Sequence, residues 1–252
     1  MPPKTLACYN LKGGVGKTCV IWALAHLYTQ QGLKVLSIDL DSQRNLTYSF
    51  GVLADAAEKN ILFGLLDCNL KANVVRTEHW GDIIPGHESL DSLGLNARQE
   101  KQEYLLREAL AKLPKKAYDF VLIDCPPGLG LTNVNALCAC DYLITPSNLE
   151  PYSIQGLYSL NNAIQQAKTK NKKLNWLGVL LTDYKPRLTL TKALEEQLSD
   201  IAKELNVYVL CSPIRYSVKV KEAITQGEPL PKGASYDDYA ALSLEIRGLT
   251  KP

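Results

Sequence analysis

The chain has 252 residues, of which 46% are hydrophobic and 21% are charged, and its formal net charge is +2. This length suffices for one α/β domain with a large core, so we expect residues 1–252 to form a single domain. No apolar run approaches the roughly 18 residues that a membrane-spanning helix needs, which argues against an integral membrane protein. The seven cysteines include no Cys-x-x-Cys pair and are typical of reduced thiols in a cytosolic protein.

Short β-rich runs alternate with helical patterns along most of the chain. Residues 5–10 form the first expected strand, and an amphipathic helix follows over residues 17–31. Further strands are expected at residues 34–39, 83–85, 118–124, 142–146, 177–182 and 207–211. Further helices are expected at residues 96–113, 131–139, 153–168, 191–205, 217–226 and 235–247. Because the strands are apolar enough to be covered on both faces, this pattern predicts a single-domain α/β fold with a twisted, mostly parallel sheet between helices. Functional residues then gather at the carboxyl ends of the strands.

A glycine-rich segment connects the first strand to the first helix. It reads Leu-Lys-Gly-Gly-Val-Gly-Lys-Thr over residues 11–18. Its three glycines let the backbone curl so that successive N–H groups point at phosphate oxygens, and the following helix adds its positive N-terminus. Lys17 is expected to reach the β- and γ-phosphates, and Thr18 is expected to bind Mg²⁺. A plain strand-to-helix turn is the alternative, which the Gly-Lys-Thr ending disfavours. The residues expected at the phosphates are Lys12, Gly13, Gly14, Val15, Gly16, Lys17, Thr18 and Cys19.

One position departs from the ordinary P-loop pattern. Leu11 stands where that pattern has its first glycine, and a second lysine, Lys12, precedes the glycine pair. This deviant Walker A motif resembles the ParA/MinD family of ATPases. In that family the extra lysine reaches the nucleotide of a partner subunit, so the resemblance implies a homodimer formed with ATP, with Lys12 acting in trans on transition-state charge. A solvated loop lysine is the alternative.

Two acidic segments complete the expected site. Asp-Leu-Asp-Ser-Gln at residues 39–43 resembles the family's switch segment Asp-x-Asp-Pro-Gln, with Ser42 in place of proline. The resemblance implies that Asp39 lies near Mg²⁺ and that Asp41 orients the attacking water. Asp124 ends an apolar strand and fits a Walker B acid, although such an aspartate is often only a helix cap. The expected reaction is hydrolysis of ATP to ADP and phosphate. Its expected catalytic residues are Lys12, Lys17 and Asp41, and the expected Mg²⁺ residues are Thr18, Asp39 and Asp124.

The resemblance continues through the C-terminal third. Residues 212–215 and 227–230 are similar to the family's Ile-Pro-Arg and Gly-x-Pro segments, which implies that Pro213 and Ile214 lie against adenine. Residues 168–221 carry eleven Lys or Arg against five Asp or Glu. Solvated helix faces are the usual explanation of such charge, but the resemblance implies a surface that binds DNA backbone without reading sequence. The residues expected on that surface are Arg187, Lys192, Arg215, Lys219 and Lys221.

The compact ParA type, without an N-terminal helix-turn-helix domain, is the form that this sequence resembles. It implies a partition or positioning ATPase whose ATP dimer binds non-specific DNA of the nucleoid. A ParB-like or other cargo adaptor stimulates hydrolysis and releases the dimer, and the cargo is a plasmid, a chromosome or a protein body such as a carboxysome. The alternatives are a metabolic P-loop amidoligase or synthetase and a MinD-like membrane-cycling regulator, which the short tail at 243–252 disfavours. We therefore expect ATP and Mg²⁺ as cofactors, no membrane partner, and a cytoplasmic, nucleoid-associated protein.

Overall fold

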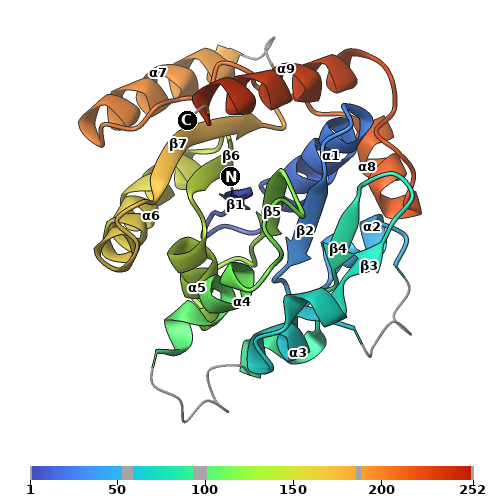
Figure 1. Cartoon of the computed structure of the whole chain (residues 1–252). Coiled ribbons are helices and arrows are strands. Elements are labelled where there is room, and N and C mark those ends of the chain that lie inside the picture. Colours follow the sequence, from blue (N-terminus) through green and yellow to red (C-terminus); the bar gives the residue numbers. More distant parts are fainter. Residues whose placement is uncertain (1, 53–58, 93–100, 186–188, 251–252) are drawn as a thin grey trace.

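A seven-stranded sheet forms the centre of the computed structural model, which describes residues 2–52, 59–92, 101–185 and 189–250. The strand order is β3-β4-β2-β5-β1-β6-β7 (Figure 1). All neighbouring strands are parallel except β3 and β4, which are antiparallel. The predicted fold class is therefore confirmed. The strands are β1 (Lys4–Cys8), β2 (Val35–Asp39), β3 (Val75–Arg76), β4 (Asp82–Ile84), β5 (Phe120–Asp124), β6 (Tyr142–Asn148) and β7 (Asn175–Thr182).

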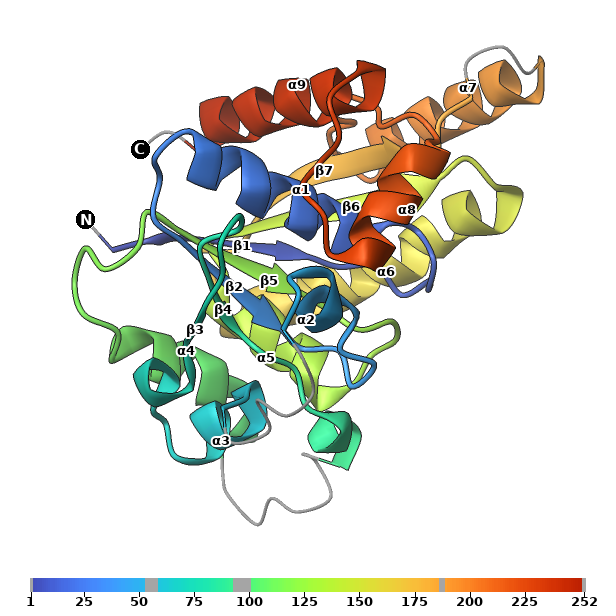
Figure 2. The same ribbon diagram turned by 90° about the vertical axis from the view of Figure 1, so that its right-hand side faces the viewer.

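Helices cover both faces of this sheet. Figure 2 shows α1, α8 and α9 on one side of the strands and α3, α4 and α5 on the other. Within the described residues, no helix is long and apolar enough to cross a membrane. The helices are α1 (Lys17–Gln30), α2 (Asn45–Ser49), α3 (Ile61–Leu66), α4 (Leu105–Ala111), α5 (Leu131–Ala139), α6 (Pro151–Lys170), α7 (Thr189–Glu204), α8 (Val218–Gln226) and α9 (Ala234–Leu249).

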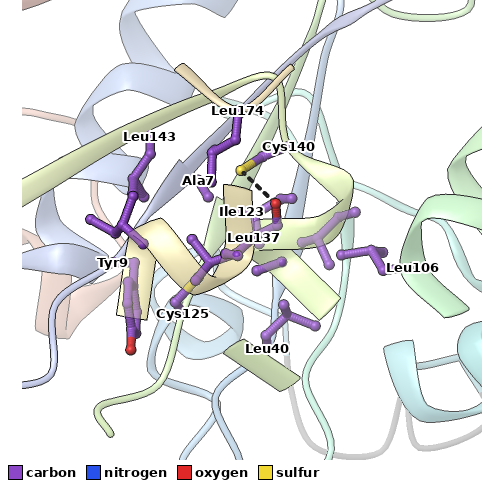
Figure 3. Close-up of a cluster of buried hydrophobic side chains, with 14 of the residues drawn as sticks. Ala7, Tyr9, Leu40, Leu106, Ile123, Cys125, Leu137, Cys140, Leu143 and Leu174 are labelled. Carbon is purple, nitrogen blue, oxygen red and sulfur yellow. Dashed lines mark hydrogen bonds between the residues drawn. The ribbon is translucent and has the colours of Figure 1, made fainter. Parts of the chain in front are cut away.

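Alternate residues of the central strands face two separate cores, because successive side chains of a strand point to opposite faces. In β1, Leu6 packs in the core formed with α1 and α9, whereas Ala7 packs in the core formed with α4, α5 and α6. Figure 3 shows the second core around Ala7, Ile123 and Leu143. The sheet is therefore packed against a buried apolar cluster on each face.

The predicted elements differ from the observed ones at several places, and the two-residue strand β3 is not among those predicted. Residues 207–211 do not form a strand of their own, because only Val209 makes a bridge to Val179 of β7. Two hydrogen bonds hold this bridge, from Val179 N to the Tyr208 carbonyl oxygen at 2.8 Å and from Leu210 N to the Val179 carbonyl oxygen at 2.9 Å. Glycine at position 178 allows the approach, because a Cβ atom there would lie 2.4 Å from the Tyr208 oxygen. The sequence pattern does not predict the short helices α2 and α3, and of the expected helix at 96–113 only the part from residue 101 is described.

Candidate nucleotide-binding site

The glycine-rich loop between β1 and α1 has the backbone shape that glycine allows. Gly14 and Gly16 adopt φ values of +71° and +86°, a region that side chains disfavour. Val15 is buried, and its carbonyl oxygen accepts a hydrogen bond of 2.9 Å from Thr182 Oγ1 at the end of β7. The loop is therefore pinned to the carboxyl edge of the sheet, and its N–H groups stand at the N-terminus of α1.

Lys17 is buried within this loop. The residue is only 7% exposed, and its Nζ donates to the carbonyl oxygens of Lys12 at 2.9 Å and Asn10 at 3.3 Å. These carbonyls bind the ammonium group but do not neutralise its charge. A phosphate group at the loop would supply the missing negative charge.

Thr18 and Asp124 form the part of the site that fits Mg²⁺. The Thr18 hydroxyl donates to Asp124 Oδ2 at 2.7 Å, while Asp124 Oδ1 is buried and has no hydrogen-bond partner among the described residues. Burial raises the pKa of Asp124 well above its ordinary value, and the neighbouring Asp39 raises it further. A divalent cation satisfies such an orphaned oxygen and reverses this penalty.

Asp39 lies beside Asp124 in the sheet, and the hydrogen bonds of its side chain hold the switch segment in place. Its side chain accepts hydrogen bonds from Asp41 N at 3.1 Å, from Thr47 N at 2.9 Å and from Thr47 Oγ1 at 2.7 Å. Burial raises the pKa of Asp39 to about 6, although the bonds from Thr47 act in the opposite direction. Within the described residues, no group of three or more His, Cys, Asp or Glu forms a closed metal site. Mg²⁺ does not require one, because it usually keeps water and phosphate ligands.

Asp41 lines a cavity of about 930 Å³ at this edge of the sheet. Its Oδ1 accepts a hydrogen bond of 2.9 Å from Gln43 N, which fixes the side chain at the start of the switch loop. Gly13, Gly14, Gly16, Lys17, Thr18 and Cys19 line the same cavity. Burial raises the pKa of Cys19 to about 11, so its thiol is protonated at neutral pH and its backbone N–H is the group suited to a phosphate.

The other wall of the cavity comes from the C-terminal part of the chain. Of the two residues expected against adenine, Ile214 lines the cavity, and Pro213 lies next to it in the sequence. Val220, Ile224 and Tyr239 add an apolar surface that the sequence did not reveal. In the sequence, the helical spacing of these residues indicates only that they are buried. It does not show that they line the cavity, because the cavity combines segments from the two ends of the chain. This wall has the apolar character that suits a purine ring.

Lys12 is placed differently from Lys17. Its Nζ is directed to the connection between β6 and α6, where it pairs with Glu150 Oε2 at 2.5 Å and contacts Asn148 Oδ1 at 3.5 Å. Asn148 Nδ2 also donates to Glu150 Oε1 at 2.6 Å. Glu150 and Asn148 were not expected in the site. Their signal in the sequence is their place at the carboxyl end of a buried strand.

Of the residues expected to bind DNA, the structure describes the side chains of Arg215, Lys219 and Lys221. Arg215 makes a two-pronged ion pair with Asp238, at 2.6 Å and 2.7 Å, and Lys221 lies 3.9 Å from Asp183. Both Arg215 and Lys221 also line the nucleotide cavity, whereas Lys219 is exposed on α8. Arg187 lies outside the described residues, as does the side chain of Lys192. The role of this group in DNA binding stays a prediction.

A glycine-rich loop over a helix N-terminus, with a buried lysine, a threonine and two buried acids, defines a P-loop ATPase. Comparison with known proteins agrees: the model of the AAA domain family matches residues 3–176. The chromosome partitioning protein ParA of Caulobacter vibrioides is 32% identical over 97% of this chain and 94% of its own length. The chain therefore belongs to the ParA/MinD family of deviant Walker A ATPases, as predicted.

Two solved structures resemble the chain over almost its whole length. Cobyrinic acid a,c-diamide synthase from Mycobacterium smegmatis, bound to an ATP analogue and magnesium, has a TM-score of 0.86 and 30% identity, covering 98% of this chain and 96% of that one. A plasmid partition protein from Borrelia burgdorferi, bound to AMPPNP, has a TM-score of 0.83 and 24% identity, covering 99% and 100%. Both structures hold an ATP analogue, and the synthase also holds magnesium, in agreement with the predicted cofactors ATP and Mg²⁺.

Proposed function

We propose that the chain is a ParA-type positioning ATPase that forms a homodimer around ATP, binds DNA without reading sequence, and is released by hydrolysis. The contrast between the two loop lysines carries this proposal. Lys17 is buried over the phosphate loop of its own chain, whereas Lys12 is directed outward to Glu150. A lysine in that position is best placed to contact the nucleotide bound by a partner subunit, whose charge it neutralises in trans.

The residues of one chain suffice to bind and position the nucleotide. The loop N–H groups and Lys17 hold the phosphates, and the apolar wall around Ile214 takes the base. Thr18 and Asp124 would hold Mg²⁺, which would supply positive charge to offset the negative charge of the phosphates. Asp41 is fixed on the cavity wall by Gln43 N, a place from which it orients a water for attack.

The surface next to the adenine wall is the proposed contact with DNA. Lys219 is exposed on α8, and α8 also contributes Val220 to the nucleotide cavity. Two such surfaces on one dimer act together, so dimerisation alone strengthens DNA binding. A cargo adaptor that stimulates hydrolysis would then release the protein from DNA. This cycle places the protein on the nucleoid in the cytoplasm.

A second candidate is an amidoligase, because the synthase from Mycobacterium smegmatis has the fold and 30% identity. Such an enzyme activates a carboxylate substrate with ATP and has no need of DNA. The two candidates therefore differ in one measurable property, the dependence of DNA binding on ATP.

The test is fluorescence anisotropy of a labelled random-sequence duplex, with ATP or ADP, at several salt concentrations. We expect binding only with ATP, with an affinity that falls steeply with salt because phosphate contacts release counterions. Lys219→Ala should weaken binding to all sequences and lower the salt slope by about one for each phosphate that it no longer neutralises. Lys172→Ala, which removes another exposed lysine, is the matched control. Equal affinity with ATP and ADP would contradict the ATP-switched cycle, and no DNA binding with either nucleotide would favour the synthase.

A further inference from the structure

A second large cavity lies at the opposite edge of the sheet. It has a volume of about 1160 Å³ and is formed by the segments that lead into β1, β2, β5, β6 and β7, together with the last turns of α9. These are the amino ends of the parallel strands, so this basal groove faces away from the nucleotide site. Five cationic residues line it: Lys4, Lys34, Lys116, Lys173 and Arg247.

Among the residues that the structure describes, no ion pair compensates the positive charge of the basal groove. Lys34, Lys116 and Lys173 are exposed, and none of them makes an ion pair within the described part of the chain. Arg247 donates to the neutral side chain of Gln31 at 2.6 Å, and Lys4 lies over the ring of Phe120. Around the nucleotide site, by contrast, three cations face carboxylates of their own chain: Lys12, Arg215 and Lys221.

The two acids of the basal groove accept hydrogen bonds from backbone N–H groups. Asp119 Oδ2 accepts a hydrogen bond of 2.8 Å from Lys34 N, and Asp141 Oδ2 accepts one of 3.0 Å from Thr5 N. Both carboxylates therefore tie neighbouring strands together at their amino ends. Five cations that converge on one groove against two such acids repel one another, and a negatively charged occupant removes that repulsion.

The groove is also partly apolar. Leu244 of α9 is 64% exposed, and the rings of Tyr118 and Tyr142 are half-buried along the wall. A duplex would present only phosphates to this groove and has no apolar side chain that could cover Leu244. An extended polypeptide fits better: its acidic side chains reach the lysines at the rim, and an apolar side chain covers Leu244.

We propose that the basal groove binds an extended acidic segment of a partner protein. The proposal does not depend on the DNA-binding cycle, because the groove and the phosphate loop lie at opposite ends of the strands. Five residues of β5 separate the two edges, which is about 17 Å at roughly 3.3 Å per residue. A partner held there leaves the phosphates uncovered, so it stays bound in every nucleotide state and acts as a constant tether.

The experiment uses a fluorescein-labelled peptide in which Asp-Glu pairs alternate with leucines, and its neutral counterpart with Asn-Gln pairs. The double variant Lys34→Glu/Lys173→Glu removes groove cations, and Lys115→Glu/Lys172→Glu makes the same change of charge at exposed lysines beside the groove. We expect anisotropy to show binding of the acidic peptide alone, equally with ADP and ATP. The groove variant should lose at least about tenfold in affinity and the control variant less than about twofold.

Circular dichroism melts establish that both variants fold. Equal losses in the two double variants would show that the peptide responds only to net charge, which overturns the proposal. Binding that disappears with ATP would also overturn it, because the site would then belong to the nucleotide cycle. The groove would instead be assigned to nucleic acid if a random DNA duplex displaced the peptide and if the groove variant bound that duplex at least about tenfold more weakly than the wild type.

Discussion

Replacing Thr47 by valine tests the network that holds the switch segment. The buried Thr47 hydroxyl donates to Asp39 at 2.7 Å and accepts from Gly86 N at 2.9 Å. Valine keeps the shape, but it removes a charge-assisted hydrogen bond worth about 1.5–3 kcal/mol and leaves a buried N–H unpaired at about 1–3 kcal/mol. The variant should lose about 3–5 kcal/mol of the free energy of unfolding, or about 10 °C in Tm for a chain of this size.

The loss should also depend on pH. The pKa of Asp39 is raised to about 6 in the folded chain from an ordinary value of 3.8, so the folded state holds this proton more strongly. Proton binding to Asp39 therefore stabilises the folded state fully below about pH 4, and this stabilisation is lost as the pH rises through about 6. The Thr47 hydroxyl lowers the pKa of Asp39, so its removal raises that pKa further. The stability deficit of Thr47→Val should consequently be larger at pH 7.5 than at pH 5.

Urea unfolding at both pH values, in magnesium-free buffer, measures this deficit. Thr145→Val is the matched control, because the Thr145 hydroxyl is buried and has no hydrogen-bond partner among the described residues. That variant should be as stable as the wild type or slightly more stable. The reasoning fails if Thr47→Val and Thr145→Val unfold within about 1 kcal/mol of each other, or if the deficit of Thr47→Val is the same at pH 5 and pH 7.5.

Three further predictions concern the nucleotide. Lys17→Ala should weaken ATP binding by at least about a hundredfold in calorimetry, because it removes the buried cation of the phosphate loop; unchanged affinity would contradict the P-loop assignment. Lys12→Ala should still bind ATP but stay monomeric with a non-hydrolysable analogue in sedimentation velocity, whereas a dimer like that of the wild type would exclude the role in trans. Asp41→Ala should bind ATP and dimerise, yet release phosphate about 10²–10⁴-fold more slowly; near-normal turnover would remove Asp41 from the mechanism.

The parts of the site that lie within one short segment could be predicted from the sequence. The phosphate loop needs glycines at positions where φ is positive, and Gly14 and Gly16 occupy them. The strand before Asp124 is apolar over its whole length, which indicates a buried strand whose last residue stands at the carboxyl edge. Both signals are local, so neither depends on knowing how the rest of the chain folds.

The interactions that join distant segments could not be predicted. Glu150 pairs with Lys12 across 138 positions of the chain, and an exposed glutamate before a helix carries no signal of such a partner. Nothing in the sequence distinguishes Thr47, yet its hydroxyl joins the switch segment to the loop that follows β4. Residues 207–211 have the composition of a strand, but only Val209 pairs with a strand of the sheet. Tertiary packing decides all three features.

Gly128, in the loop after Asp124, ties that loop to the phosphate loop. Its N–H donates to the carbonyl oxygen of Leu11 at 3.0 Å, and its own carbonyl accepts from the Tyr9 hydroxyl and from Asn133 Nδ2, both at 2.9 Å. The φ of Gly128 is +87°, so a side chain at this position is strained. The hydrogen bond from Gly128 N therefore joins the phosphate loop to the loop that carries Pro127 on the cavity wall. This contact uses the backbone of Leu11, the position where ordinary P-loops have glycine, so it does not depend on the side chain at that position.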